Sequence, residues 1–335
     1  MIEVDAVFPR ALEARLPRLT APHDAALRLF NGYTEGLPRV AVDVYGTTLV
    51  VHDATSADGD AAMVDRLVEL AREKLPWLEA GLCKLRESEV TSMRNGTLLF
   101  GTEAQLAKRV QEDGVWYAIR LQLNRDSSFY LDTAPLRAWA KASLSGKRVL
   151  NAFSYTGSLG AAAKAGGATH VVSTDLNKAF LSVAKDTWSI NRWPIVKTDF
   201  ITGDFFDVVG KQKREGELYD CVFVDPPFFS VTTQGRVDLE ADMARLLNKA
   251  RPLIADGGTL VAINNGVFVT GAAFEKTLAE VCGDGYLKVE QRVEIPLDFA
   301  GHPGTRSGTP LTDPAPYNHS TKVAILRVKR KDGRV

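Results

Sequence analysis

The apolar run Tyr219–Val224 ends in Asp225-Pro226-Pro227-Phe228-Phe229. An acidic residue and two prolines after a buried strand predict a rigid edge of oxygen acceptors, because proline fixes its backbone and offers no N–H donor. The two phenylalanines add a flat apolar face, and aromatic rings stack on bases for roughly 1–3 kcal/mol. The combination predicts a site for a planar nitrogenous ring such as a nucleobase. The alternative for either phenylalanine is that it fills the core.

Three more residues follow predicted strands. Gly157 comes after 148–152, Asp175 after 170–174, and Asp204 after a short apolar stretch. Parallel strands bind ligands at their carboxyl ends. There the Gly157 turn and the following helix N-terminus can hold a polar or carboxylate group, and Asp175 can accept hydrogen bonds from both hydroxyls of a ribose. Asp204 could then accept from an adenine amino group, which predicts an adenosine-containing cofactor. The alternatives are a plain glycine turn, a helix cap at Asp175 and a turn at Asp204.

The elements that position these residues alternate between strand and helix. Expected strands at 148–152, 170–174, before 204, 219–224 and 259–263 enclose helices at 158–165 and 179–191. This spacing predicts a mainly parallel sheet. Two late strands, 287–295 and 322–329, have no helix between them and predict an antiparallel pair at the sheet edge. The Gly/Pro/Ser/Thr-rich stretch 301–316 is expected to be a long loop inside that pair.

A smaller unit precedes this sheet. Strands 39–43 and 48–52 flank Tyr45-Gly46 as a hairpin, a helix follows at 61–75, and short strands are expected near 83–86, 98–101 and 116–121. The proline-containing N-terminus favours an extended or short-helical arm. We therefore expect an arm at 1–27, a small α/β domain at 28–124 and a larger α/β domain at 125–335.

Charge and cysteine content limit the class of protein. Lys plus Arg number 41, as do Asp plus Glu, so a nucleic-acid surface would have to be a local patch. Cys83, Cys221 and Cys282 are widely spaced without metal-ligand spacing, which is typical of reduced cytoplasmic thiols. No signal peptide and no apolar stretch of about 18 residues stands out. We expect a cytoplasmic protein with no metal site and no membrane span.

Together with Arg125-Asp-Ser-Ser-Phe-Tyr-Leu-Asp132 and Val149-Leu-Asn-Ala-Phe-Ser-Tyr-Thr-Gly157, these motifs resemble class I S-adenosylmethionine-dependent methyltransferases. The match is similar to the bacterial 23S ribosomal RNA methyltransferases, which include cytosine-C5 and guanine-N7 enzymes. The resemblance implies a Rossmann-like seven-stranded α/β sheet with a smaller N-terminal α/β domain. It also implies S-adenosyl-L-methionine as cofactor and 23S rRNA, or a large-subunit assembly intermediate, as partner. Many cytosine-C5 relatives begin with a PUA RNA-binding domain, and we expect no segment of this sequence to be long enough for one.

The resemblance also implies roles for single residues. Phe129 to Asp132 would close over the cofactor, and Asp225 would face both the methyl donor and the target base. The implied cofactor contacts come from Phe129, Tyr130, Asp132, Asn151, Phe153, Tyr155, Thr156, Gly157, Asp175, Leu176, Asp204, Phe205 and Asp225. The implied catalytic group is Asp225, Pro226, Phe228, Phe229 and Asn264.

Chemistry separates the two branches of this family. Methylation of cytosine C5, a poor nucleophile, needs a cysteine thiolate, which those relatives carry just after the fifth strand. Here that stretch reads Val261-Ala-Ile-Asn-Asn-Gly266 without cysteine, and Cys221 is expected to be buried and inert. The Asn264-Asn265 pair resembles the guanine-N7 branch, and its amides could bind a guanine edge or merely form the turn. We therefore expect direct transfer to guanine N7, aided by proximity.

Four alternatives stay open. The first is cytosine-C5 methylation with an unrecognised nucleophile, and the second is methylation of a protein or small molecule, which the neutral net charge favours. The third is a non-catalytic RNA-binding or assembly factor with a relict pocket. A nicotinamide-dependent dehydrogenase fits the fold alone, but its G-x-G-x-x-G fingerprint is missing and Asp225-Pro-Pro-Phe-Phe would have no purpose.

Overall fold

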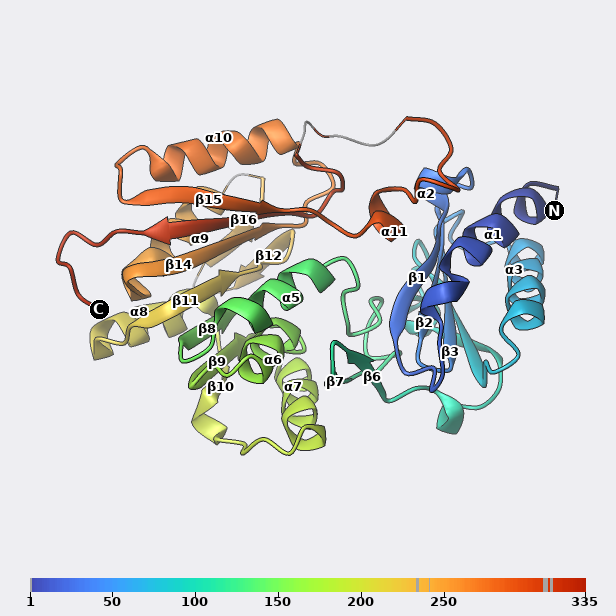
Figure 1. Ribbon diagram of the computed structural model, residues 1–335, viewed down its shortest axis with the longest axis horizontal. Helices are drawn as coiled ribbons and strands as arrows, with labels where there is room; N and C mark the ends of the chain where they lie inside the picture. Colours follow the sequence, from blue (N-terminus) through green and yellow to red (C-terminus); the bar gives the residue numbers. More distant parts are fainter. Residues whose placement is uncertain (1, 233–234, 241, 310–312, 314–315) are drawn as a thin grey trace. The chain divides into compact units, whose positions relative to one another are not determined.

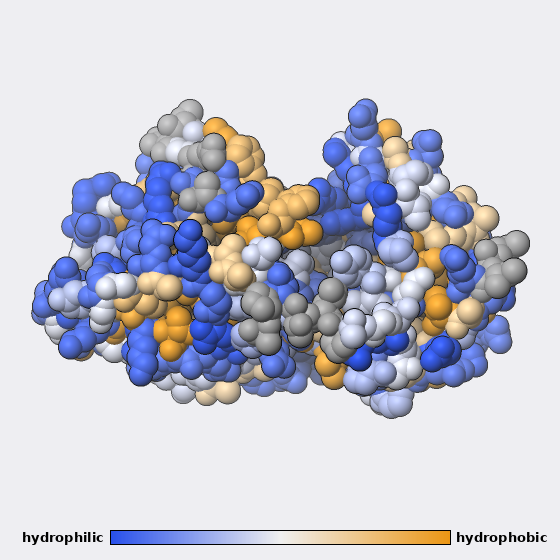
Figure 2. All heavy atoms as spheres, turned by 90° about the horizontal axis from the view of Figure 1, so that it is seen from above, coloured by the Kyte–Doolittle hydropathy of each residue, from blue (hydrophilic) through white to orange (hydrophobic). Residues whose placement is uncertain are grey.

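The computed structural model describes the whole chain except residues 1, 233–234, 241, 310–312 and 314–315 (Figure 1). Two compact units account for it. The first unit comprises Met1–Leu131 with Pro296–Leu311, and the second comprises Asp132–Ile295 with Thr312–Val335. The face shown in Figure 2 is mostly hydrophilic, with hydrophobic residues gathered in a few patches. No helix among the described residues is long and apolar enough to cross a membrane.

The first unit is built on a five-stranded sheet of order β1-β2-β3-β4-β5. Only the β3–β4 pair is parallel, and helix α3 makes that crossover, with Asp60 accepting from the Met63 N–H at its N-terminus. A separate hairpin pairs β6 with β7. The elements are α1 (Ile2–Arg15), a 3-10 turn (Leu16–Arg18), β1 (Ala26–Asn31), α2 (Gly32–Glu35), β2 (Val40–Tyr45), β3 (Thr48–Asp53), α3 (Ala61–Lys74), β4 (Ala80–Leu85), α4 (Thr91–Asn95), β5 (Thr97–Phe100), a 3-10 turn (Glu103–Gln105), β6 (Arg109–Glu112), β7 (Val115–Ala118) and α11 (Leu297–Ala300).

The N-terminal segment differs from the expected arm. It forms the 14-residue helix α1, and Val4, Phe8 and Leu12 lie buried in the core of the first unit. Pro9 stands inside this helix. The sequence did not predict a long helix here because proline is unfavourable inside a helix. Burial of one apolar face nevertheless stabilises the helix through tertiary packing.

The C-terminal segment 296–311 also differs from expectation, because it belongs to the first unit rather than to the larger domain. Its Asp298 is buried and pairs with the buried Arg15, Nε to Oδ1 at 3.2 Å. Asn31 Nδ2 donates to the Phe299 carbonyl at 2.6 Å. These partners are separated by more than 250 positions in sequence, so no local pattern reveals them. The expected continuous domain 125–335 is therefore interrupted.

The second unit contains the seven-stranded Rossmann-like sheet, which confirms the expected fold class. Its order is β10-β9-β8-β11-β14-β16-β15. The strands from β10 to β14 are parallel, and β16 pairs antiparallel with both β14 and β15. The elements are α5 (Ala134–Ser143), β8 (Arg148–Ala152), α6 (Ser158–Ala165), β9 (His170–Asp175), α7 (Lys178–Ile190), a 3-10 turn (Lys197–Asp199), β10 (Phe200–Thr202), α8 (Phe205–Glu215), β11 (Tyr219–Val224), β12 (Phe229–Thr232), β13 (Gly235–Asp238), α9 (Met243–Ala250), a 3-10 turn (Arg251–Leu253), β14 (Ile254–Asn264), α10 (Gly271–Cys282), β15 (Leu287–Val293) and β16 (Lys322–Val328).

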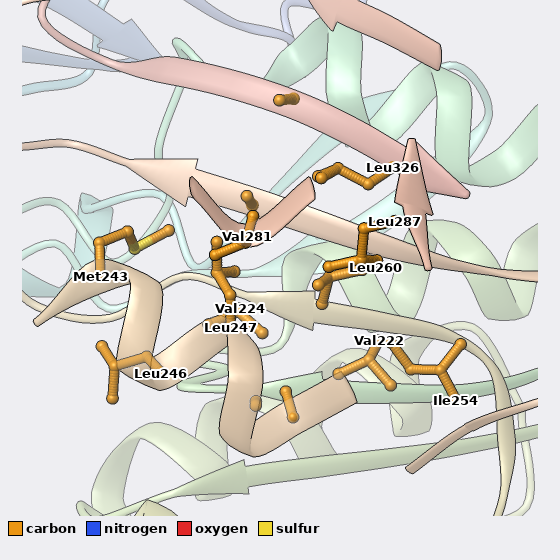
Figure 3. Close-up of a cluster of buried hydrophobic side chains, with 14 of the residues drawn as sticks. Val222, Val224, Met243, Leu246, Leu247, Ile254, Leu260, Val281, Leu287 and Leu326 are labelled. Carbon is orange, nitrogen blue, oxygen red and sulfur yellow. The ribbon is translucent and has the colours of Figure 1, made fainter. Parts of the chain in front are cut away.

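Helices cover both faces of this sheet, with α5, α6 and α7 on one face and α8, α9 and α10 on the other (Figure 1). Successive side chains along a strand point to opposite faces of the sheet, so each face has its own hydrophobic core. Val222 and Val224 of β11 pack with Leu246, Leu247 and Leu260 on the α9 side (Figure 3), while Phe223 meets Trp139 of α5 edge to face at 6.3 Å. Because both of its faces are buried, the central strand β11 consists almost entirely of apolar residues. The β12–β13 hairpin was not expected from the sequence.

Candidate active site

The carboxyl ends of the parallel strands meet at one edge, as the sequence predicts. Register pairs Ala152 of β8 with Thr174 of β9 and with Val224 of β11, and Val224 in turn with Ala262 of β14. The residues that follow these positions in each strand therefore line the same edge.

The loop after β8 has an unusual backbone. Phe153 and Tyr155 adopt φ of 54° and 50°, and Gly157 adopts 79°. Left-handed conformations of non-glycine residues cost of order 1–3 kcal/mol each and are concentrated at functional sites. Gly157 is required twice over, because a Cβ there would also lie 2.8 Å from the Ala184 Cβ. The loop thus reaches the N-terminus of α6 in a fixed shape, which suits close approach of a ligand.

Asp175 helps to hold this loop. Its Oδ2 accepts from the Tyr155 N–H and its Oδ1 from the Asn177 N–H, both at 2.8 Å. Burial raises the pKa of Asp175, although these backbone donors counteract the effect. The side chain that caps α7 is that of Asn177, not that of Asp175. Each carboxylate oxygen can accept more than one bond, so Asp175 can still receive ribose hydroxyls. Leu176 beside it is 56% exposed, free to contact a ring.

Asp204 is already engaged within the protein. Its Oδ1 accepts from the Phe206 N–H at 2.8 Å at the start of α8, and its Oδ2 accepts from Thr232 Oγ1 at 2.6 Å. The capping interaction is thus present, and the adenine contact expected of Asp204 stays a prediction. Phe205 is buried and stacks on Phe153 at 4.6 Å, so it supports the β8–α6 loop from behind.

Several enclosed polar atoms near these strand ends have no hydrogen-bond partner within the described part of the chain. They are Asn151 Oδ1 and Nδ2, Ser154 Oγ and Ser173 Oγ. Asn151 and Ser173 stand opposite each other in the β8–β9 register. Leaving such groups unpaired costs about 1–3 kcal/mol each. A polar ligand at this edge would satisfy them, which fits the expected adenosine cofactor. Thr156, another expected contact, is also buried here.

Asp225 is the most perturbed acid of the site. Its Oδ1 is enclosed and lacks a hydrogen-bond partner among the described residues. Burial, together with the nearby charge of Asp132, raises the pKa of Asp225 to about 7. Asp132 itself accepts from Thr321 Oγ1 at 2.7 Å. A carboxyl group shifted in this way at a strand end is typical of functional sites. It would attract a cationic group.

The aromatic residues after Asp225 face solvent. Pro226 is buried, but Phe228 is 39% and Phe229 is 57% exposed. Neither side chain is buried, so the alternative that either phenylalanine fills the core is wrong. Part of the surface of each ring is thus exposed to solvent.

Asn264 serves the turn after β14. It is only 1% exposed, and its Oδ1 accepts from the Gly266 N–H at 3.0 Å. That oxygen is used by the turn, so the role of Asn264 toward a guanine stays a prediction, whereas Asn265 is half-buried. The buried Lys322, which sequence reasoning missed, donates from Nζ to the Gly266 carbonyl at 3.2 Å. Nothing in the local sequence around a lysine at the start of a strand indicates that its side chain binds a distant backbone carbonyl.

Phe129 and Tyr130 lie in the first unit. Phe129 is buried against Tyr117, with ring centroids 4.9 Å apart. The Tyr130 hydroxyl donates to Asp126 Oδ2 at 3.1 Å, and the ring is 37% exposed. Their expected role in covering a cofactor stays a prediction.

None of the three cysteines stands at the strand-end edge. Cys221 is fully buried within β11, and burial raises the pKa of its thiol far above the usual value. Cys83 lies in β4 of the first unit with its pKa raised to about 12, mainly by burial. Cys282 ends α10. The expectation of a buried Cys221 is confirmed.

Comparison with known proteins agrees with this geometry. Residues 97–305 match the family described as S-adenosylmethionine-dependent methyltransferase. The ribosomal RNA large subunit methyltransferase I of Aliivibrio fischeri strain MJ11 is 29% identical over 282 residues, covering 82% of this chain and 70% of the relative. Its namesake from Escherichia coli O139:H28 is 27% identical over 278 residues, covering 82% and 69%.

Solved structures share the fold. A methyltransferase crystallised with SAH superimposes with a TM-score of 0.82 at 22% identity, covering 96% of this chain and 80% of the other. A protein from Streptococcus mutans described as SAM-dependent gives 0.78 at 23% identity with the same coverage. One from Agrobacterium tumefaciens gives 0.62 at 20% identity, covering 88% of each chain.

Proposed function

The chain belongs to the S-adenosylmethionine-dependent methyltransferase family, and from this premise we propose that it methylates a base of large-subunit ribosomal RNA. Relatives named ribosomal RNA large subunit methyltransferase I support this acceptor. The observation that carries the proposal is the enclosed Oδ1 of Asp225, which has no hydrogen-bond partner among the described residues, close in sequence to the exposed rings of Phe228 and Phe229. A flat, electron-rich heterocycle matches that pairing of a polar acceptor with an apolar face.

The residues at the strand ends fit S-adenosylmethionine. Asp175 would accept hydrogen bonds from the ribose hydroxyls, and Asp204 would accept one from the adenine amino group. The Phe153–Gly157 loop would surround the methionine half of the cofactor. The buried polar atoms of Asn151 and Ser173, which lack hydrogen-bond partners in the part of the chain that the structure describes, could bind such a polar molecule. When bound, the cofactor supplies an electrophilic methyl group on a sulfonium. The Asp225 carboxylate would attract that positive charge and orient both reactants.

The absence of a suitably placed thiol favours a nitrogen acceptor, and we favour guanine N7. Attack at cytosine C5 requires a thiolate beside the base, whereas Cys221 lies inside the sheet. The N7 lone pair forms the new N–C bond while the methyl–sulfur bond breaks, and no proton has to leave the base. Positive charge then appears on the guanine ring. An ionised Asp225 next to that ring would stabilise the charge as it develops.

The test is transfer of tritiated methyl groups to ribosomal RNA from a strain that lacks the protein, followed by nucleoside analysis. The proposal predicts labelled 7-methylguanosine. Labelled 5-methylcytidine would keep the ribosomal RNA acceptor but replace the N7 assignment by the covalent mechanism. Absence of label, with calorimetry still showing cofactor binding, would point to a protein or small-molecule acceptor. Absence of cofactor binding would instead favour a relict pocket.

A further inference from the structure

Five exposed apolar side chains lie on the two segments that follow Asp225 and Asn264, and we refer to them as the apolar lip. Its members and their exposed fractions are Phe228 (39%), Phe229 (57%), Val231 (65%), Val267 (74%) and Phe268 (78%). They come from two segments, the one that follows β11 and the one that follows β14. The two segments meet where the rings of Phe228 and Phe268 contact each other, with centroids 6.1 Å apart. Exposed apolar clusters of this kind mark binding surfaces.

The segment that carries Phe268 is held in place from both sides. The Gly266 N–H donates to Asn264 Oδ1 at 3.0 Å, and its carbonyl accepts from Lys322 Nζ at 3.2 Å and from the Val269 N–H at 3.2 Å. Thr270 then caps helix α10 by accepting from the Ala273 N–H. Phe268 is thus exposed on a braced turn, and a preformed surface binds with a smaller entropic cost than a flexible one.

Gly266 connects this turn to the reactive edge. A Cβ at this position would lie 3.3 Å from Phe228 Cδ2 and 2.9 Å from the Val269 side chain. Any side chain there would press on the Phe228 ring, three residues after Asp225. Glycine therefore lets the Phe268 turn and the Phe228 ring pack closely.

Lys322 is the brace of this arrangement. It is 1% exposed and stands opposite Asn264 in the β14–β16 register. Its Nζ donates to the carbonyls of Gly266 and Ser320. A buried ammonium group is tolerated only when its donors are satisfied, so the lysine and the Gly266 carbonyl fix each other. The turn that carries Phe268 is consequently fixed by the fold.

We propose that Phe268, braced by Lys322, stacks on the base adjacent to the target base in the acceptor RNA, while Phe228 contacts the target itself. This proposal rests on the proposed function. A base that reaches Asp225 must leave its stack, which costs a few kcal/mol and leaves its neighbour without a stacking partner. An exposed aromatic ring beside the site replaces that partner. The lip requires no base pairing, so it selects unpaired segments of RNA.

The experiment measures binding of a short fluorescein-labelled single-stranded RNA by anisotropy, in the presence of S-adenosylhomocysteine. Phe268→Ala is expected to weaken this binding at least about fivefold, in line with the loss of one stacked base, whereas Phe268→Trp keeps it. Val196→Ala is the matched control. Val196 is 50% exposed in the same unit, but it lies before the edge strand β10, which β9 and β8 separate from β11. Calorimetry with S-adenosylhomocysteine should give equal affinities for all four proteins.

Each outcome decides between the two proposals. If the wild type methylates ribosomal RNA and Phe268→Ala binds the RNA as well as Val196→Ala does, the stacking role is wrong while the proposed function stands. If the wild type binds cofactor but neither binds nor methylates RNA, the proposed function fails and the stacking role fails with it. Selective weakening in Phe268→Ala, restored by tryptophan, supports both.

Discussion

Asp225 is enclosed at the end of β11, and the charge of Asp132 adds to the effect of that burial in raising its pKa to about 7. The two carboxyl groups differ in their partners. Asp132 has Thr321 Oγ1 as a hydrogen-bond donor at 2.7 Å, whereas Asp225 Oδ1 has none among the described residues. The enclosed Asp225 carboxyl group can therefore change its protonation state near neutral pH.

Asp225→Asn should stabilise the fold above neutral pH while abolishing methyl transfer. The pKa of Asp225 is raised from 3.8 to about 7 in the folded protein. The unfolded chain therefore releases this proton first, and stability is lost as the pH rises from about 4 to about 7. At 1.36 kcal/mol per pKa unit the loss reaches at most about 4 kcal/mol, so we expect the variant to melt at least about 3 °C higher near pH 8.

The gain in melting temperature should be smaller near pH 5, where wild-type Asp225 is mostly protonated in the folded state. Asp207→Asn, an exposed acid in the first turn of α8, serves as control and should show no gain at high pH. A Tm for Asp225→Asn that equals that of wild type near pH 8 would contradict the assigned pKa.

The rate of methyl transfer should depend on pH through the same group. If the ionised carboxyl group of Asp225 is needed, kcat/KM should rise about tenfold per pH unit below about 7 and then level off, because kcat/KM reports the free enzyme. Asp132→Asn removes the neighbouring negative charge and should move the midpoint to lower pH. A flat profile between about pH 6 and 8 would exclude an ionised Asp225 from the rate-determining chemistry.

Asp175→Ala should weaken cofactor binding about tenfold or more, since it removes both the predicted ribose acceptor and the bond that shapes the β8–α6 loop at the Tyr155 N–H. Calorimetry with S-adenosylhomocysteine measures the change. Asp204→Ala is measured beside it. This variant removes the side chain that caps α8, so its free energy of unfolding should fall by about 1 kcal/mol. Equal cofactor affinities of wild type and Asp175→Ala would contradict the ribose assignment.

The strand-end acids and glycine could be predicted because each is marked locally, by a strand before it and a helix or turn after it. Gly157, Asp175 and Asp225 are positions of this kind. The roles of Asp298, Thr321 and Lys322 could not be predicted, since each depends on a partner far away in sequence. Asp298 pairs with Arg15, and Lys322 reaches Gly266 only through the antiparallel β14–β16 register.

The hydrogen bonds that Asp204 and Asn264 make to their own chain could be predicted only as alternatives to ligand binding. The same short-range polar residue either caps its own chain or faces a ligand, and sequence spacing is identical in the two cases. Thr232, which donates to Asp204, lies on a hairpin that no turn signal identified. The residues at the cofactor side of the candidate site can therefore be predicted from local sequence, whereas those at the acceptor side depend on tertiary contacts.

Replacing all three cysteines by alanine should leave methyl transfer within about twofold of wild type if no thiolate adduct forms. Cys221 is fully buried, so the variant should lose some stability from the small cavity, and activity must be compared below its melting temperature. Nucleoside analysis of the product RNA is the readout. Complete loss of transfer, with the circular dichroism spectrum and cofactor affinity unchanged, would restore the covalent mechanism.

Lys322→Met should raise the KM for RNA while changing the cofactor dissociation constant little. Methionine keeps most of the buried chain length but removes the donor to the Gly266 carbonyl, so the turn that carries Phe268 loses its brace. The melting temperature should change less than for a broken buried ion pair, because the cost of burying the ammonium is removed at the same time. Arg327→Met, exposed on the same strand and paired with Glu290, is the control and should leave KM unchanged. An equal KM for Lys322→Met and the control would show that the lysine does not position the lip.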